Sequence, residues 1–433
     1  MESVWASLFL FLVLLAFLGT SIWIAASIFL VAVVGLHFFT SVPATQVAGN
    51  ILWNSTNSYT LVALPLFILM GEVLLKTKIA KWMFDGLAPW LSALPGGLLH
   101  VNVVASAFFA AVSGSSVATA ATIGRINIPE LLPRGYHPSL VVGSLAGAGT
   151  LGFLIPPSIV LIIYGVLAQV SIGQLFIAGI VPGLLLALAF MLYLGGVGLI
   201  RRDLVPKERQ VYTWLERFLG LAKLFPVTVL IFAVLGSIYT GLATPTESAA
   251  IGVLGAVLLG LFYRTLNWQN FVDAVTSTVR TTSMIGLIIA SASVLSTTMG
   301  YLGIPRTLAQ TIVGLELSPY LLMLVLALFY ILLGLFLDGI SMIVVTLPIT
   351  LPLVVAAGFE PLWFGIFLVL MVETAQITPP VGLNIFVIQS ISNHSVGYVA
   401  RAALPFFFIM LFITALVTVY PALATGLPSL MQR

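Results

Sequence analysis

The stretch Ser113-Gly114-Ser115-Ser116 lies inside an apolar run that covers about residues 98–124. A helix that simply crosses a membrane does not need a polar centre broken by glycine. A helical hairpin that enters the bilayer and turns back does, because non-helical backbone at that depth must line a cavity or be buried in protein. A second apolar run carries Asp338-Gly339-Ile340-Ser341 at the corresponding place. We therefore predict two re-entrant hairpins whose tips face each other near mid-membrane and hold a solute and its coupling ions.

The composition is that of a membrane protein. The chain has 433 residues, of which 61% are hydrophobic and 7% are charged, and its mean hydropathy is +1.19. Soluble domains carry about a quarter charged residues. The apolar runs are continuous, not alternating, which argues against an outer-membrane barrel. The chain contains no cysteine, which excludes disulfides, thiolate metal sites and cysteine nucleophiles. We predict an all-α polytopic membrane protein.

The sequence repeats itself at an offset of 223 residues, the separation of Gly135 from Gly358. Ser115 falls on Asp338 at the same offset. Prolines recur at this offset as well, in the pairs Pro129 and Pro352, Pro138 and Pro361, Pro156 and Pro379, Pro157 and Pro380, and Pro182 and Pro405. Such coincidences indicate two copies of one folding unit, although a shared membrane-helix composition is the alternative explanation.

We therefore divide the chain into a first repeat (1–200), a charged linker (201–223) and a second repeat (224–433). Each repeat begins with scaffold spans, continues with a hairpin and contains a helix broken at a Pro-Pro pair. In repeat order, the scaffold spans cover residues 4–75 and 224–299, the hairpins 98–124 and 319–355, and the broken helices 138–169 and 361–389. Residues 41–59 read as an aqueous loop or interfacial segment, residues 125–137 as a polar connection, and the linker as a cytoplasmic amphipathic helix.

The placement of basic residues predicts how the repeats are oriented. Lysines and arginines cluster in two connections of the first half, residues 76–81 and 125–137, and in the linker, residues 201–223, whereas residues 348–360 contain none. Positive residues mark the cytoplasmic side. Each repeat contributes five full crossings, because its hairpin returns to the side from which it entered. Since five is an odd number, the second repeat is inverted relative to the first. Inverted repeats with broken helices at mid-membrane are characteristic of secondary transporters.

The broken helices can supply oxygen ligands. The pairs Pro156-Pro157 and Pro379-Pro380 remove N–H donors, so carbonyls about one turn earlier, on residues 149–155 and 373–378, lose their partners. Together with the hydroxyls of Ser113, Ser115 and Ser116 they would form a cage suited to a hard cation. We expect Na+, although oxygen ligands alone do not exclude coupling to H+.

Each of these features has a structural alternative. A Gly/Ser cluster can serve close helix packing, a Pro pair can be a kink, and Asp338 and Glu373 could pair with basic side chains. Intramembrane carboxylates are nevertheless functional by default, because burying them is costly. Glu247 follows Thr244 at the start of a span and is expected to cap a helix. Glu72 reads as a solvated or snorkelling residue near the interface.

A different class of function, an intramembrane hydrolase with Ser115 as nucleophile, would need a base. The histidines of the chain lie in loops or at span ends, at His37, His100, His137 and His394. A phosphate-binding G-x-x-x-x-G-K-[ST] motif is also absent from the sequence. We therefore expect neither an enzyme nor an ATP-driven pump, and no nucleic-acid partner.

Several motifs resemble the large membrane subunit (DctM type) of the tripartite ATP-independent periplasmic (TRAP) transporters. Together they cover nearly the whole chain. In order they are Ala63-Leu-Pro-Leu-Phe-Ile-Leu-Met-Gly-Glu72, Ser113-Gly-Ser-Ser116, Ile128-Pro-Glu130 with Arg134-Gly-Tyr136, Ile155-Pro-Pro-Ser158, Gly241-Leu-Ala-Thr-Pro-Thr-Glu247, Leu337-Asp-Gly339 and Ile377-Thr-Pro-Pro-Val-Gly-Leu-Asn384.

The resemblance implies Na+-driven uptake of a small organic acid by an elevator motion across the bacterial inner membrane, with two or more Na+ ions. It implies two partners, a small four-helix membrane subunit and a periplasmic binding protein that delivers the solute. The alternative is a standalone Na+/dicarboxylate carrier of related hairpin fold that uses no binding protein.

Site residues also follow from the resemblance. One Na+ site would involve Ser113, Gly114, Ser115, Gly149 and Pro156, and the other Gly339, Ser341, Thr374, Thr378 and Pro379. The solute would contact Ser116, Asp338, Glu373 and Asn384. The chain departs from the family pattern at Arg125, where a small polar residue is expected, and at Gln376, where glycine is expected.

Overall fold

A computed structural model of the chain describes residues 22–206, 212–314 and 318–430, together with a few positions between residues 9 and 19. Within these residues the chain is built of helices and connections, and no strand occurs. Seven of the described helices are long and apolar enough to cross a membrane, or eight if the bent pair Ala44–Thr56 and Tyr59–Leu75 forms one span. The predicted all-α polytopic class is confirmed. Predictions for the span before residue 22, and for Lys207 and Arg209, lie outside the described residues.

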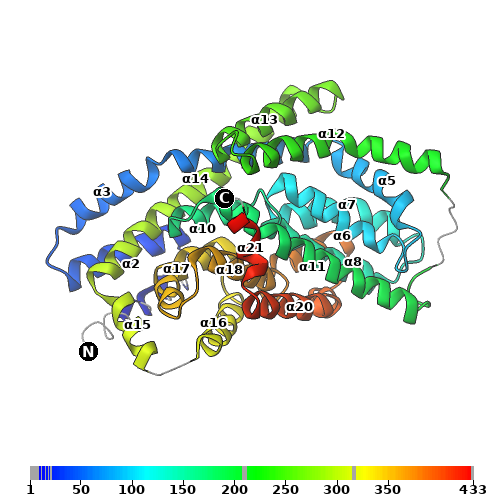
Figure 1. Cartoon of the computed structure of the whole chain (residues 1–433). Helices are drawn as coiled ribbons and strands as arrows, with labels where there is room; N and C mark the ends of the chain where they lie inside the picture. The colour runs from blue at the N-terminus through cyan, green and yellow to red at the C-terminus, as the bar shows by residue number, and fades with distance from the viewer. Residues whose placement is uncertain are drawn as a thin grey trace.

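The helices predicted as scaffold pack on one another. Helices α2 and α3 lie against α14, α4 packs on α13 and α14, and α12 packs on α13. In Figure 1 these helices occupy the left and the top of the molecule. Their bounds are α2 (Ile24–Phe39), α3 (Ala44–Thr56), η1 (Tyr59–Val62), α4 (Ala63–Leu75), α12 (Trp214–Tyr239), α13 (Pro245–Phe262) and α14 (Trp268–Tyr301).

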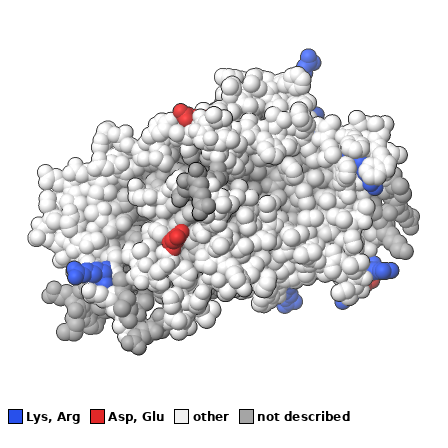
Figure 2. Space-filling view, in the orientation of Figure 1, with Lys and Arg blue, Asp and Glu red and all other residues white. Residues whose placement is uncertain are grey.

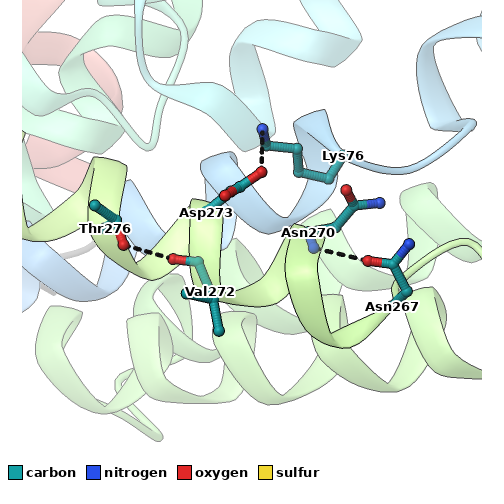
Figure 3. Close-up of polar contacts among 6 residues, drawn as sticks. All are labelled: Lys76, Asn267, Asn270, Val272, Asp273 and Thr276. Carbon is teal, nitrogen blue, oxygen red and sulfur yellow. Dashed lines mark hydrogen bonds and ion pairs between the residues drawn. The ribbon is translucent and has the colours of Figure 1, made fainter.

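One end of the scaffold is marked by charge. Lys76, which follows α4, lies 3.8 Å from the carboxylate of Asp273 near the start of α14 (Figure 3). Asn267 caps α14 by accepting a hydrogen bond from the N–H of Asn270. Both partners of the ion pair are partly exposed, so it contributes little stability. The ion pair shows which ends of α4 and α14 lie at the same face of the molecule.

The remaining helices correspond to the predicted hairpins, the predicted broken helices and the helices that support them. Helix α6 packs on α7 and α8, α8 packs on α20, and α18 packs on α17 and α20. The first repeat supplies α5 (Ile79–Leu91), α6 (Leu99–Ser113), α7 (Ser116–Leu131), α8 (Pro138–Gly149), α9 (Leu151–Leu154), α10 (Ile159–Ala168) and α11 (Ile172–Ile200). The second supplies α15 (Ile304–Gly314), α16 (Pro319–Leu333), α17 (Gly339–Ala356), α18 (Pro361–Gln376), α19 (Leu383–Ser392), α20 (Val396–Val419) and α21 (Ala422–Leu430).

The helix breaks fall where local chemistry predicts them. Helix α6 ends because Gly114 adopts a left-handed conformation with φ of +59°, which glycine reaches without steric cost. Ser115 then caps α7 by accepting a hydrogen bond from the N–H of Ala118. Asp338 caps α17 in the same way. The two Pro-Pro pairs interrupt the chain between α9 and α10 and between α18 and α19, and both Pro-Pro bonds are cis.

Three segments differ from the sequence-based expectation. Of the two alternatives for residues 41–59, the loop is wrong, because residues 44–56 form helix α3, which packs on α14; the interfacial segment stays a prediction. Helix α7 continues to Leu131 through the predicted polar connection, because Asn127 donates a hydrogen bond of 2.6 Å to Asn102 on α6 and holds the extra turns. The amphipathic linker helix is not separate, since a capping box of Thr213 and Glu216 starts α12, which runs unbroken to Tyr239.

Charged side chains are sparse over the surface. Figure 2 shows a face that is almost entirely uncharged, with most lysines and arginines at its edges. Large apolar side chains are exposed along α12 and α13, including Trp214, Phe218 and Leu254. Such surfaces are expected where a protein meets lipid or another membrane subunit.

Candidate functional site

The first hairpin tip is seated directly on the first helix break. The N–H of Ile159, at the start of α10, donates a hydrogen bond of 3.2 Å to the carbonyl of Gly114. A Cβ at Gly114 would lie 2.7 Å from the carbonyl oxygen of Pro157, and one at Gly152 would lie 2.5 Å from that of Ser115. The two glycines therefore allow backbone-to-backbone contact, and the tip and the break form one unit.

Polar groups within this tip are held by short contacts. The Ser113 hydroxyl lies 3.0 Å from that of Thr119, which donates a hydrogen bond of 2.8 Å to the carbonyl of Ser115. Ser113 is buried, and Gly71 of α4 packs against its backbone. The structure thus places the tip residues Ser113, Gly114 and Ser115 beside the break at Pro157, which follows the buried Pro156. Thr119 belongs to the same cluster, although the sequence analysis did not single it out.

A buried carboxylate joins the two predicted repeats. Glu373 of α18 is 0% exposed, and its Oε1 accepts a hydrogen bond of 2.7 Å from the N–H of Phe153 in α9. Its Oε2 accepts one of 2.8 Å from the hydroxyl of Ser116, which begins α7. Asn384 of α19 donates a hydrogen bond of 2.9 Å from its amide to the same hydroxyl. Three of the four residues predicted to contact the solute, Ser116, Glu373 and Asn384, therefore lie together. We call these three side chains the inter-repeat network.

The inter-repeat network contains more acceptors than donors. The Ser116 hydroxyl also lies 3.1 Å from the carbonyl of Gly149, yet it has only one hydrogen to donate. The side-chain oxygen of Asn384 is buried without a hydrogen-bond partner in the described structure, and so is that of Gln376, which lies at the second tip and not in the network. No ion pair among the described residues involves Glu373, so the salt-bridge alternative receives no support there. Buried oxygens of this kind suit a hard cation, which takes carboxylate, amide and carbonyl oxygens as ligands.

The second tip has a different arrangement. Asp338 accepts hydrogen bonds from the N–H groups of Ile340 and Ser341 and a very short one from the Ser341 hydroxyl. A Cβ at Gly339 would collide with Val372 and lie 3.1 Å from Nε2 of Gln376 on α18. The tip thus packs on the break of its own repeat. Asp338 makes its contacts within its own hairpin and is not part of the inter-repeat network.

The other residues predicted for the second site surround this junction. Thr374 donates its hydroxyl to the carbonyl of Leu370, and Thr378 donates its own to the carbonyl of Thr374, both at 2.7 Å. Each hydroxyl keeps lone pairs that could face a cation. Pro379 is exposed, whereas Pro156 at the first break is buried. The second junction is therefore the more open of the two.

Glu247 lies outside both junctions. It forms a capping box with Thr244 at the start of α13: its carboxylate accepts a hydrogen bond of 2.7 Å from the N–H of Thr244, whose hydroxyl accepts one from the N–H of Glu247. The capping role predicted for Glu247 is confirmed.

Solved structures of two transporters share this fold. One is the YdaH transporter of Alcanivorax borkumensis, with a TM-score of 0.64 and 16% sequence identity, covering 88% of this chain and 89% of that structure. The other is MtrF of Neisseria gonorrhoeae, with a TM-score of 0.58 and 15% identity, covering 92% and 93%. At these identities the similarity shows the architecture alone.

Comparisons of sequence alone find relatives of higher identity. The chain is 35% identical to a C4-dicarboxylate TRAP transporter large permease protein of Pseudomonas aeruginosa, over 87% of this chain and 88% of that protein. It is 31% identical to the sialic acid TRAP transporter large permease protein of Vibrio cholerae, over 89% of each. It is 33% identical to the isethionate TRAP transporter permease protein DctMQ of Oleidesulfovibrio alaskensis, over 94% of this chain and 64% of that protein. Residues 7–423 match the family model described as the tripartite ATP-independent periplasmic transporter, DctM component. The chain therefore belongs to the DctM family of TRAP transporter large permeases.

Proposed function

We propose that this permease imports a small organic acid together with Na+ across the bacterial inner membrane. The observation that carries the proposal is the inter-repeat network, in which a fully buried Glu373 meets a hydroxyl, an amide and a backbone N–H but forms no ion pair among the described residues. An isolated buried carboxylate is costly unless it is neutralised or paired. A bound cation near these oxygens would offset that cost.

The coupling ions would bind at the two junctions between tip and break. The first holds Ser113, Gly114, Ser115, Gly149 and Pro156, and the second Gly339, Ser341, Thr374, Thr378 and Pro379. Hydroxyl and carbonyl oxygens predominate in both sets, which favours an alkali cation over a transition metal. The positive charge would in turn attract an anionic solute, which has no basic side chain of the network to pair with.

The solute is proposed to be a carboxylate or a similar organic anion. The relatives compared above are named for C4-dicarboxylates, sialic acid and isethionate, which are all small organic anions. Ser116 and Asn384 would contact the solute by hydrogen bonding. They come from different repeats, and their side chains hydrogen-bond each other in the network. Binding there would bridge the two halves of the moving unit.

The packing is compatible with an elevator motion. Each tip rests on the break of its own repeat, and the inter-repeat network joins the two junctions across the repeats. The ion sites and the solute site would therefore travel as one body. The mutually packed scaffold helices would provide the stationary frame.

Two partners are proposed, a small four-helix membrane subunit and a periplasmic binding protein that delivers the solute. The family description names a three-part transporter of which this component is one. The exposed apolar faces of α12 and α13 offer a surface for the small subunit within the bilayer. A standalone carrier of the same fold would need neither partner.

The test is solute uptake into proteoliposomes that contain the chain and its two partners. Radiolabelled succinate, N-acetylneuraminate and isethionate serve as probes, each offered with the binding protein. Uptake should require an inward Na+ gradient and the binding protein. Equal uptake with K+ in place of Na+ would overturn the coupling, and undiminished uptake without the binding protein would favour the standalone carrier.

A further inference from the structure

A polar cavity lies away from the inter-repeat network, and none of the network residues lines it. It has a volume of about 730 Å³ and lies between the scaffold helix α14, the segment that connects α3 to η1, the end of α10 and the second arm of the second hairpin, α17. Ligand cavities for small molecules have volumes of roughly 300–1,000 Å³. None of the described residues that line this one is charged.

The position of basic residues assigns this cavity to the extracytoplasmic half of the protein. Lys76 and Asp273 mark one end of α4 and α14. Tyr59, just before α4, and Ser296, near the other end of α14, line the cavity. Because basic residues mark the cytoplasmic side, the cavity faces the compartment from which a solute would arrive.

One wall is a polar stripe on a membrane-spanning helix. Ser293, Ser296 and Thr297 share one face of α14, at spacings of three and four residues. Ser293 and Thr297 donate their hydroxyls to carbonyls of their own helix, each at 3.0 Å, so that their lone pairs remain free. The Ser296 side chain has no hydrogen-bond partner among the described residues and is exposed. Polar groups at such positions are expected to line a water-filled or solute-filled space.

The opposite walls supply further donors and acceptors. Asn54 and Asn57, at the end of α3, present side-chain amides that make no hydrogen bond within the described part of the chain. Pro348 and Pro352 of α17 also line the cavity. Each lacks an N–H, so the carbonyls four residues earlier lose their usual helical donor. The cavity therefore offers amide N–H donors together with hydroxyl and carbonyl acceptors.

We propose that this cavity is an entry site, where a small hydroxylated or carboxylate solute binds transiently before it reaches the inter-repeat network. The inference rests on the proposed transport function. Amide and hydroxyl donors from Asn54, Asn57 and Ser296 bind the oxygens of the solute. The absence of acidic lining residues avoids repulsion of an anion, and the absence of basic ones keeps binding weak. Weak binding is what a transit site requires, since the solute must leave it again.

The alternative occupant is a lipid chain. An apolar occupant would leave the amides of Asn54 and Asn57 and the Ser296 hydroxyl without partners in a low-dielectric space, which is costly. The two occupants also differ in whether the cavity contains water. Accessibility of the cavity wall to a water-soluble reagent therefore separates them.

The chain contains no cysteine, so single cysteines can be introduced without a background signal. Ser296→Cys places a thiol on the cavity wall. Leu287→Cys is the matched control, because Leu287 is an exposed residue of the same helix that does not line the cavity. Intact cells are treated from outside with a membrane-impermeant anionic methanethiosulfonate, and remaining thiols are counted with a fluorescent maleimide after solubilisation.

The Ser296 variant should react at least about tenfold faster than the Leu287 variant, because the thiolate is the reactive form and lipid excludes it. Modification should then lower uptake of the probe solutes by about tenfold or more, since the reagent fills the space the solute would occupy. An unreactive cysteine at position 296 would overturn the aqueous site. Full uptake after complete modification would overturn the entry role.

Two checks keep this result interpretable. If Ser296→Cys does not insert into the membrane, Ser293→Cys tests the same wall one turn earlier. The unmodified cysteine-free chain is assayed in parallel for Na+-dependent uptake. Absence of transport there is a failure of the proposed function, whereas normal transport with an unreactive cysteine is a failure of the entry site alone.

Discussion

Replacing Gly152 with alanine would push the first hairpin tip away from the helix break. An added Cβ at this position would lie 2.5 Å from the carbonyl oxygen of Ser115 and 2.6 Å from the Cα of Ser116. These are backbone atoms, which cannot rotate aside as the end of a long side chain can. Ordinary carbon contacts lie at about 3.5–4.0 Å, so the tip must move by about 1 Å.

A movement of this size would break the inter-repeat network. The hydrogen bond from the Ser116 hydroxyl to Glu373 is 2.8 Å long, and an increase of about 1 Å takes it beyond hydrogen-bond length. Misplacement of reacting or coordinating groups by about 1 Å costs on the order of 100-fold in function. Overpacking also destabilises by about 1–3 kcal/mol. We expect the Na+ concentration for half-maximal uptake to rise by about 10- to 100-fold.

The assay is uptake into proteoliposomes as a function of Na+ concentration, with thermal unfolding measured on the same samples. Gly286→Ala is the matched control, because Gly286 also lies within a helix, α14, but a Cβ there would meet nothing within 4 Å. It should leave Na+ dependence unchanged and stabilise the helix by about 0.5–1 kcal/mol. If Gly152→Ala transports with the parent's Na+ affinity while remaining folded, the contact of tip and break has no role in coupling.

Four further substitutions separate the contributions of charge, capping and coordination. Glu373→Gln keeps an acceptor for the N–H of Phe153 and a polar group for Ser116 but removes the negative charge. This variant should fold normally and lose Na+-dependent uptake. Retained Na+ dependence would show that the charge of Glu373 has no role in Na+ coupling. Ser115→Ala and Asp338→Asn should each lower Na+ affinity with normal membrane insertion, and unchanged affinity in both would return these residues to packing. Glu247→Ala should reduce the free energy of unfolding by about 1 kcal/mol through loss of a cap, without altering Na+ affinity, and a change in affinity would contradict its purely structural role.

The helix breaks could be predicted because local chemistry determines them. Gly114 reaches a left-handed conformation, Ser115 and Asp338 cap the following helices, and each Pro-Pro pair interrupts its helix whatever surrounds it. The capping role of Glu247 followed from the same kind of local pattern. These features need no knowledge of the tertiary arrangement.

The contacts across the repeats could not be derived in this way. Glu373 meets Phe153 through a backbone N–H that lies 220 residues away, and no side-chain pattern marks a backbone donor. Thr119 belongs to the first tip because its hydroxyl, on α7, lies within hydrogen-bond distance of the Ser113 hydroxyl. The sequence predicts a boundary inside α12, between the linker (201–223) and the span that begins at residue 224, because charge and hydropathy change there. In the structure α12 crosses this point unbroken, with Pro226 inside it.

The most direct test of the central claim is the thermal stability of the purified permease in NaCl and in KCl of equal ionic strength. A ligand that binds only the folded state stabilises it by about 2.7 kcal/mol when present at 100 times its dissociation constant. We predict that the unfolding temperature rises with Na+ concentration and not with K+. Gly152→Ala should shift this rise to higher Na+ concentration, Glu373→Gln should abolish it, and Gly286→Ala should retain it. Identical unfolding curves in the two salts would contradict the claim that the oxygens of the tips and breaks bind Na+.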